Sequence, residues 1–145
     1  MKTLDFKIYL GLLTETYNDA HQADLTRTGA LPIDMVVVNL YPFSQTIAKK
    51  GINLENARGN IDIGGPTMIR AAAKNFIRVA SVTDPAQYPD LLETLKAGQG
   101  CLTLADRFEL AARAFDHTAV YDRAIADYLA GRAGAALDSC YNTGA

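Results

Sequence analysis

The feature that most restricts the fold is a short apolar run over residues 34–42, DMVVVNLYP, rich in β-branched side chains. Pro32 and Pro42 lie near its two ends and limit it to the length of a strand. Because the valines are consecutive, both faces of such a strand are apolar, which is typical of a strand buried in a parallel sheet. A second, weaker run of the same kind covers residues 77–83.

The segments between and after these runs have helical patterns. We expect helices over residues 44–50, 54–61 and 66–75, and a further helix from Pro85 to about Ala97. Strand, helix and strand in this order predict a right-handed crossover and an α/β sheet. Two strands alone leave much of a parallel sheet uncovered, so either further strands escape detection or another part of the domain is missing or supplied by another chain.

The longest helical pattern follows residue 103. Thr103 and Asp106 resemble a capping box, and apolar residues then recur at helical spacing until Gly131. The pattern fits one long helix or two helices with a bend near His117. We therefore expect one domain over residues 1–130 and a C-terminal tail of little periodicity over residues 131–145.

Composition excludes several classes of protein. The chain has 145 residues and a net charge of −2, so no basic excess indicates a nucleic-acid partner. Its longest apolar stretches are too short to span a membrane, and we expect no membrane partner. The two cysteines have no metal-binding spacing, and the two histidines are too few for a histidine-based metal site. We expect a reduced, cytoplasmic protein without a metal.

Residues 61–75, IDIGGPTMIRAAAKN, combine an acid, a glycine turn, a helix start and a cation. Gly64 and Gly65 let a ligand approach backbone N–H groups, and Asp62 can accept a hydrogen bond from an amide or a hydroxyl. Lys74 lies nine residues beyond Gly65, a rise of about 13 Å along a helix, so one ligand touching both must lie along the helix or the lysine must reach back. The same pattern is also typical of a plain glycine turn before a solvated helix with a surface lysine.

Two further pairs of residues have the right chemistry for a ligand. Asn39 and Tyr41 follow the best strand, and ligands of open α/β sheets bind outside the carboxyl ends of the strands. They also fit a polar strand end and a tyrosine at the rim of the core. Lys2 and Thr3 suit a phosphate or a ribose, although a terminal pair of this kind is commonly disordered. His117 lies in an amphipathic helical pattern, where we expect a packed side chain and not a catalyst.

Three stretches in order along the chain resemble IMP cyclohydrolase, the amino-terminal domain of a bifunctional purine-synthesis enzyme that also carries AICAR formyltransferase. They are residues 34–43 (DMVVVNLYPF), residues 61–75 and residues 114–122 (AFDHTAVYD). The resemblance covers nearly the whole chain, from Lys2 to about Leu129. It implies an α/β fold, here a partial doubly wound parallel sheet of the methylglyoxal synthase-like type with a C-terminal helical extension.

The resemblance also implies an activity, without a cofactor. The formylated aminoimidazole carboxamide ribotide closes its second ring and loses water to give inosinate, a reaction of a nucleotide-binding hydrolase. Four residues match the catalytic set: Lys74 for the proton and developing charge, Asp62 for the carboxamide nitrogen, and Tyr41 and Asn39 around the formyl oxygen and base. Five match the substrate-binding set: Lys2, Thr3, Ile63, Gly64 and Gly65. Ring closure benefits from holding the amide against the formyl carbon and from donors aimed at the oxyanion.

The chain also departs from the family. The family continues Lys-Thr-Leu with His-Pro-Lys-Val-His-Gly-Gly, whereas residues 5–11 read DFKIYLG, so both histidines and one glycine differ. Two phosphate loops that precede Lys-Thr-Leu in the family do not occur in this sequence, and formyltransferase activity is not expected. We therefore expect a homodimer or a companion chain that supplies the phosphate site. The alternative is a non-catalytic remnant or assembly module of the same fold.

Overall fold

The computed structural model describes residues 4–132. These residues form two compact units: unit 1 has residues 4–40 and 63–118, and unit 2 has residues 41–62 and 119–132. The expected boundary of the tail at residue 131 stays a prediction, because residues 133–145 lie outside the described part.

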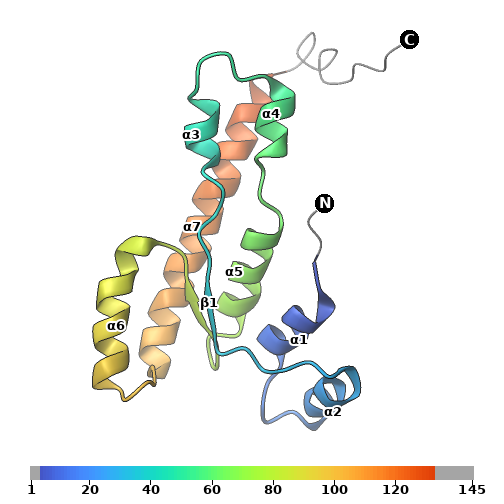
Figure 1. Cartoon of the computed structure of the whole chain (residues 1–145), viewed down its shortest axis with the longest axis vertical. Coiled ribbons are helices and arrows are strands. Elements are labelled where there is room, and N and C mark those ends of the chain that lie inside the picture. Colours follow the sequence, from blue (N-terminus) through green and yellow to red (C-terminus); the bar gives the residue numbers. More distant parts are fainter. Residues whose placement is uncertain (1–3, 133–145) are drawn as a thin grey trace. The chain divides into compact units, whose positions relative to one another are not determined.

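A two-stranded parallel sheet lies in unit 1 (Figure 1). Its strands are β1 (Met35–Val37) and β2 (Ala80–Val82), which confirms the α/β class expected from the order of strand, helix and strand. The register pairs Met35 with Ala80, Val36 with Ser81 and Val37 with Val82. One backbone hydrogen bond at each end continues the pairing, from Ala80 N–H to Asp34 (2.9 Å) and from Val38 N–H to Val82 (3.0 Å). Beyond these bonds the two segments of the chain do not pair, so each strand is shorter than the apolar run that contains it.

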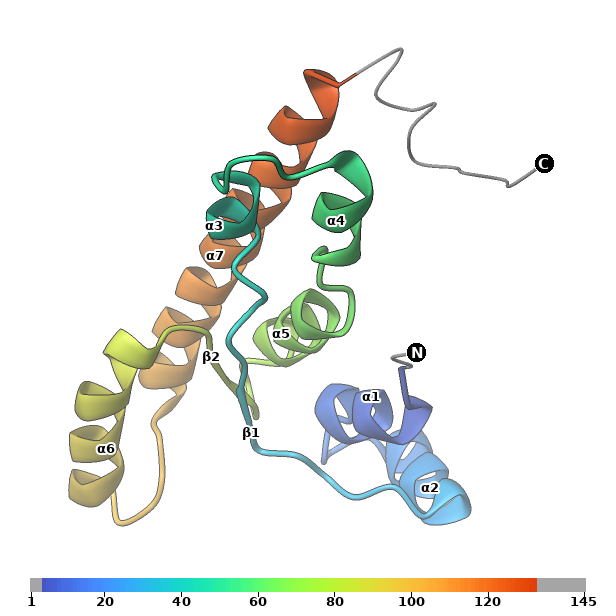
Figure 2. The same ribbon diagram turned by 45° about the horizontal axis from the view of Figure 1, so that its top comes forward.

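Unit 1 also contains two helices that the sequence patterns left unassigned, α1 (Phe6–Leu13) and α2 (Asp19–Thr28). Side chains cap the N-terminal ends of both helices. Asp5 accepts a hydrogen bond from the N–H of Lys7, and Asn18 accepts hydrogen bonds from the N–H groups of Ala20 and His21. Gly29 ends α2 with a left-handed backbone (φ 64°), a conformation that favours glycine. Figure 2 shows α1 and α2 side by side.

The remaining helices largely follow the expected ranges. In unit 1 these are α5 (Gly64–Lys74), a 3-10 turn η1 (Pro85–Gln87), α6 (Tyr88–Ala97) and the first part of α7 (Leu104–Ala130). We expected α5 to start at Pro66, and it begins two residues earlier, at Gly64. Asp84 and Gln87 form a capping box at the start of η1.

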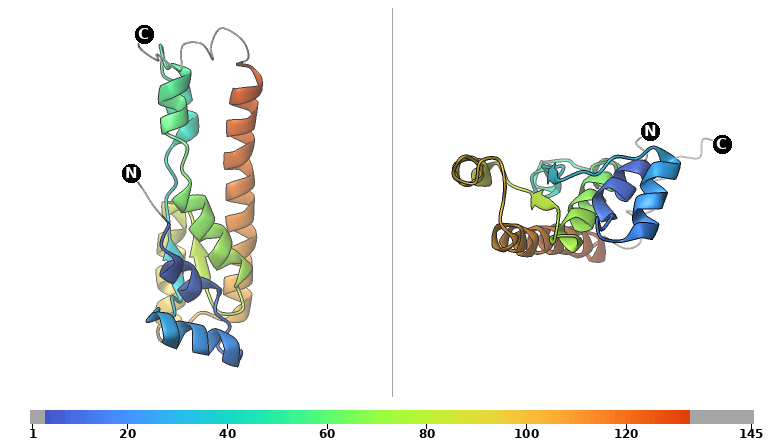
Figure 3. Two further views of the ribbon diagram at one scale, coloured as in Figure 1. Left: turned by 90° about the vertical axis from the view of Figure 1, so that its right-hand side faces the viewer. Right: turned by 90° about the horizontal axis from the view of Figure 1, so that it is seen from below.

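The expected alternatives for the last helix are resolved, because α7 is one continuous helix (Figure 3). Its predicted capping box is confirmed: Thr103 N–H donates to Asp106 Oδ2 (2.8 Å) and Asp106 N–H donates to Thr103 Oγ1 (3.2 Å). The Thr103 hydroxyl also donates to Asp106 Oδ2 (2.7 Å), and this bond, followed by the one from the Thr103 N–H, lowers the pKa of the Asp106 carboxyl.

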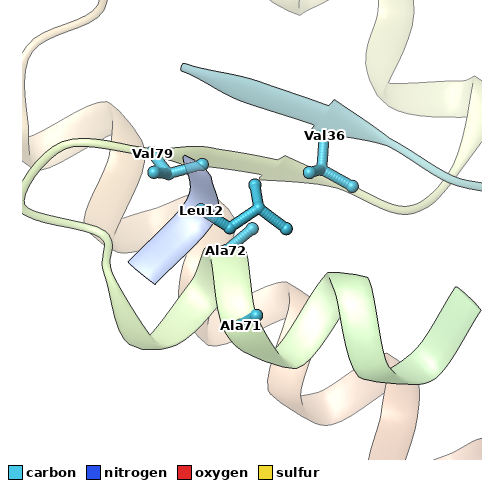
Figure 4. Packing of buried hydrophobic residues seen from close by; sticks show 5 residues of the cluster. All are labelled: Leu12, Val36, Ala71, Ala72 and Val79. Atoms are coloured by element: carbon cyan, nitrogen blue, oxygen red, sulfur yellow. The ribbon is translucent and has the colours of Figure 1, made fainter. Parts of the chain in front are cut away.

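The core of unit 1 lies between the sheet, α1 and α5. Figure 4 shows the buried side chains gathered there: Leu12, Val36, Ala71, Ala72 and Val79. Ala71 and Ala72 on this face of α5 let its backbone approach the strands closely, whereas the third alanine of the run belongs to another cluster. A second buried cluster joins α5 to α7 through Ile69, Ala73, Ala111 and Ala114.

The end of α1 is held by two polar side chains that follow α5. Asn75 is buried and donates to the carbonyls of Leu12 (2.7 Å) and Thr14 (3.1 Å). Arg78 donates to the carbonyls of Gly11 and Thr14 and pairs with Asp34 (2.9 Å). These bonds satisfy carbonyls that a helix end leaves without partners, and they fix α1 against the rest of unit 1.

Unit 2 contains α3 (Phe43–Ile47), α4 (Leu54–Gly59) and the last part of α7. Its most buried large side chain is Phe43, which packs edge to face against Tyr121 and Tyr128 with ring centroids 6.3 and 5.7 Å away.

No helix within residues 4–132 combines the length and the apolar character needed to cross a membrane. Over the same residues, no group of three or more potential metal ligands comes together. Cys101 is exposed and free, and Cys140 lies outside the described residues.

Candidate functional site

In unit 2, Asp62 lies beside Tyr41. The N–H of Tyr41 donates to Asp62 Oδ2 at 3.4 Å, and the N–H of Asp62 donates to the hydroxyl of Tyr121 at 2.9 Å. Burial raises the pKa of Tyr121, the hydrogen bond from the Asp62 N–H lowers it by less, and the nearby Asp62 and Asp122 carboxylates add smaller increases. Tyr121 therefore stays protonated at neutral pH.

Tyr121 is a residue that we did not assign to the site from the sequence. It lies 59 positions from Asp62 in the chain, and only the folded backbone brings them together. Its presence in the AFDHTAVYD stretch was the one signal that could have pointed to it.

The start of α5 belongs to unit 1 and contains Ile63, Gly64 and Gly65. Ile63 precedes the helix, has no side-chain cap and is 64% exposed. A side chain built on Gly64 would make only an ordinary contact, 3.6 Å from Leu4 Cδ2, and Gly64 does not have a positive φ. Neither packing nor a positive φ therefore requires glycine at position 64.

Lys74 is the last residue of α5, and its side chain is exposed. It lies ten residues, or about 15 Å, from Gly64 along the helix. Arg70, one turn before Lys74, lies over the ring of Phe115 with 5.4 Å to the centroid. The two cations of this helix face are thus used differently: Arg70 packs on a ring, and Lys74 extends into solvent at the helix end.

Asn39 also lies in unit 1 and is exposed. Its side-chain amide makes a hydrogen bond with the hydroxyl of Tyr88, at 3.1 Å from Nδ2. Tyr88 is the second residue that we did not find from the sequence, since it lies 49 positions away. The pair presents an amide and a phenol together at the carboxyl end of β1, where open α/β sheets bind ligands.

The structure thus brings together Asp62 and Tyr41 in unit 2, and Ile63, Gly64 and Gly65 in unit 1. Within unit 1 it places Lys74 at the opposite end of α5 from the glycines. Lys2 and Thr3 lie outside the described residues, so their role stays a prediction.

The two histidines lie in different parts of unit 1. His21 accepts the N–H of Glu15 at Nδ1 (3.2 Å), and its Nε2 lies 3.4 Å from Asn18 Nδ2. These contacts hold the ring between the end of α1 and the start of α2. His117 lies within α7 and is half-buried.

Comparison with known proteins identifies the family. A family model described as the AICARFT/IMPCHase bienzyme matches residues 72–143. The chain belongs to this family. The bifunctional purine biosynthesis protein PurH of Bacillus subtilis (strain 168) is 50% identical over 129 residues, and PurH of Neisseria gonorrhoeae (strain ATCC 700825 / FA 1090) is 51% identical over 129 residues. Each match covers 89% of this chain.

The chain spans about a quarter of the length of these curated relatives, 25% and 24% respectively. Among solved structures, the crystal structure of ForH matches with a TM-score of 0.77 and 31% sequence identity, over 89% of this chain and 66% of that one. These matches support the α/β fold with its small parallel sheet and C-terminal helix. The methylglyoxal synthase-like type stays a prediction.

Proposed function

We propose that this chain carries the IMP cyclohydrolase type of ring closure, in which a formylated aminoimidazole carboxamide ribotide becomes inosinate. The observation that carries the proposal is the position of Asp62: its carboxylate accepts the N–H of Tyr41, and its own N–H donates to the Tyr121 hydroxyl. The chain that holds it is 50% and 51% identical to two PurH proteins over 129 residues. A carboxylate held in this way can accept a proton of a carboxamide nitrogen and orient its lone pair.

The reaction needs one bond to form and one to break. The carboxamide nitrogen attacks the formyl carbon and loses one proton, the formylamino nitrogen loses a second proton as its bond to that carbon becomes double, and the formyl oxygen takes up two protons and leaves as water. We assign orientation of the nitrogen to Asp62 with the Ile63–Gly64 backbone, and proton delivery and charge stabilisation to Lys74. Asn39 and Tyr41 hydrogen-bond the formyl oxygen and base, and Lys2, Thr3 and Gly65 bind the nucleotide. The proposed reaction uses no cofactor or metal and takes place in the cytoplasm.

The direct test is a rate measurement on the full chain. The purified protein is mixed with the formylated ribotide, and inosinate absorbance is followed above the spontaneous rate. A rate in excess of the spontaneous one is expected. No excess, for the chain alone or mixed with companion purine enzymes, would remove the proposal and leave a non-catalytic assembly module of the same fold.

Gly64→Ala tests whether the glycine at the start of α5 lets a ligand approach the backbone N–H groups. Because the added methyl group has room beside Leu4, we expect the same thermal unfolding midpoint as the unchanged chain. The methyl group would displace a ligand that approaches the backbone, so we expect kcat/KM to fall at least about tenfold. Gly59→Ala, at a position with nothing within 4 Å, is the matched control and should keep full activity. Full activity of Gly64→Ala would contradict the assignment of Gly64.

The sheet supports a proposal about assembly. Within residues 4–132, the sheet has two strands, so each strand has one edge without a neighbour. Val37 on β1 is 51% exposed, whereas parallel strands are normally covered on both faces. We propose that a second copy of the chain, or a companion chain, covers β1 and supplies a phosphate site.

Light scattering on the purified chain tests the version with a second copy. We expect a mass near twice 15.6 kDa, and a shift toward this value as concentration rises. Val37→Lys should shift the equilibrium toward the single chain, because it places a charge on the uncovered strand. Lys50→Glu, an exposed change in a turn, should leave the mass unchanged. A mass of 15.6 kDa at every concentration would contradict self-association and leave the companion chain.

A further inference from the structure

The stretch over residues 114–122, AFDHTAVYD, carries part of the family resemblance, yet the proposed reaction gives none of its residues a role. Tyr121 of this stretch lies in the last part of α7, within unit 2. Its hydroxyl accepts the N–H of Asp62 (2.9 Å) and donates to the carbonyl of Asn60 at the longer distance of 3.5 Å. Both bonds reach the short segment that follows α4 and contains Asp62.

This segment, residues 60–62, has no regular secondary structure, so other contacts must fix its backbone. The N–H groups of Asn60 and Ile61 donate to carbonyls at the end of α4 (3.0 and 3.1 Å). The next N–H, that of Asp62, donates instead to Tyr121, a side chain 59 positions away. The Asp62 carboxylate then accepts the N–H of Tyr41 (3.4 Å). The place of the carboxylate therefore depends on Tyr121 through the backbone of Asp62 itself.

The ring and the hydroxyl of Tyr121 have separate contacts. The ring packs edge to face against Phe43, with 6.3 Å between centroids, whereas the hydroxyl bonds to the segment of Asp62. Tyr128, two turns further along α7, packs against Phe43 in the same way at 5.7 Å. Within residues 4–132, however, the buried Tyr128 hydroxyl has no hydrogen-bond partner. The two tyrosines thus share their packing on Phe43 and differ in the bond to Asp62.

We propose that Tyr121 is a positioning residue for ring closure, whose hydroxyl holds the backbone of Asp62 so that the carboxylate meets the carboxamide nitrogen. The inference rests on the proposed function, because Tyr121 acts only through Asp62 and touches no reacting atom. A small displacement is enough to matter, since a misplacement of about 1 Å can lower an enzymatic rate about 100-fold.

Tyr121→Phe tests the proposal, because it keeps the ring on Phe43 and loses only the hydroxyl. We expect kcat for the formylated ribotide to fall about tenfold to 100-fold, and KM to change less than about twofold, because other residues are assigned to binding the nucleotide. Tyr128→Phe is the matched control and should keep the full rate. Rates are measured well below the unfolding midpoint of each variant, so that lost stability does not lower them.

A double-mutant cycle with Asp62→Ala separates positioning from a merely structural role. If Tyr121 acts through the carboxylate, Tyr121→Phe should lower the rate of the unchanged chain but hardly lower the residual rate of Asp62→Ala. A structural role would lower both rates by the same factor. Equal factors, or an unchanged rate in Tyr121→Phe, would overturn this inference and leave the proposed function standing. No ring closure by the unchanged chain would overturn the proposed function and this inference with it.

Amide hydrogen exchange at Asp62, followed by NMR, adds a readout that does not depend on activity. The Asp62 N–H should exchange at least about tenfold faster in Tyr121→Phe than in the unchanged chain, because its acceptor is gone. Tyr128→Phe should exchange at this position as the unchanged chain does. Equal exchange in Tyr121→Phe would mean that the hydroxyl does not hold this N–H, and would overturn the inference even in an active chain.

Discussion

Lys74→Ala should lower the ring-closure rate by about 100-fold to 10,000-fold, the range that a general acid or base contributes. The chain should keep its fold, because Lys74 is exposed at the last position of α5 and alanine is the best helix former. Circular dichroism and the unfolding midpoint should therefore match those of the unchanged chain. The measurement is kcat/KM for the formylated ribotide.

Two further variants separate the roles of Lys74. Lys74→Arg keeps the positive charge but does not release a proton near neutral pH, so it should recover part of the rate if charge is what matters, and none if proton transfer is. Lys50→Ala removes another exposed lysine, in the turn after α3, and should leave the rate unchanged. A Lys74→Ala protein with the unchanged rate would show that the assignment is wrong.

Gly11→Ala should have the largest effect on stability. The added Cβ would lie 2.3 Å from the carbonyl oxygen of Leu31 and 3.1 Å from Ile33 Cγ1. The first of these contacts is with backbone, which cannot turn aside as a flexible side chain can. The Gly11 carbonyl also accepts the N–H of Ile33 (3.1 Å) and a bond from Arg78, so a shift of α1 would disturb both.

We expect Gly11→Ala to lower the free energy of unfolding by about 2–3 kcal/mol, as overpacking in a closed site commonly does. Denaturant unfolding followed by circular dichroism measures it. Gly59→Ala makes the same chemical change at the end of α4 with nothing within 4 Å, and should be neutral or slightly stabilising. Equal midpoints for the two variants would contradict the tight approach of α1 to Leu31.

Several elements could be predicted because their signals are local. The valine run gave β1, the glycine and proline turn gave the start of α5 to within two residues, and Thr103 with Asp106 gave the cap of α7. Each depends on residues within a few positions of one another. The helices α1 and α2 were not predicted from the sequence. For α1 the reason is that most of its residues are apolar, so the pattern shows no separate polar and apolar faces.

The sequence alone determined the α/β class, the family and the chemical types of the candidate site residues, because periodicity, caps and motif spacing are properties of short stretches of chain. Only the tertiary structure decided which of those residues meet. Tyr88 joins Asn39 across 49 positions and Tyr121 joins Asp62 across 59. Contacts of this kind depend on how distant elements fold against one another, and no local pattern in the chain specifies that.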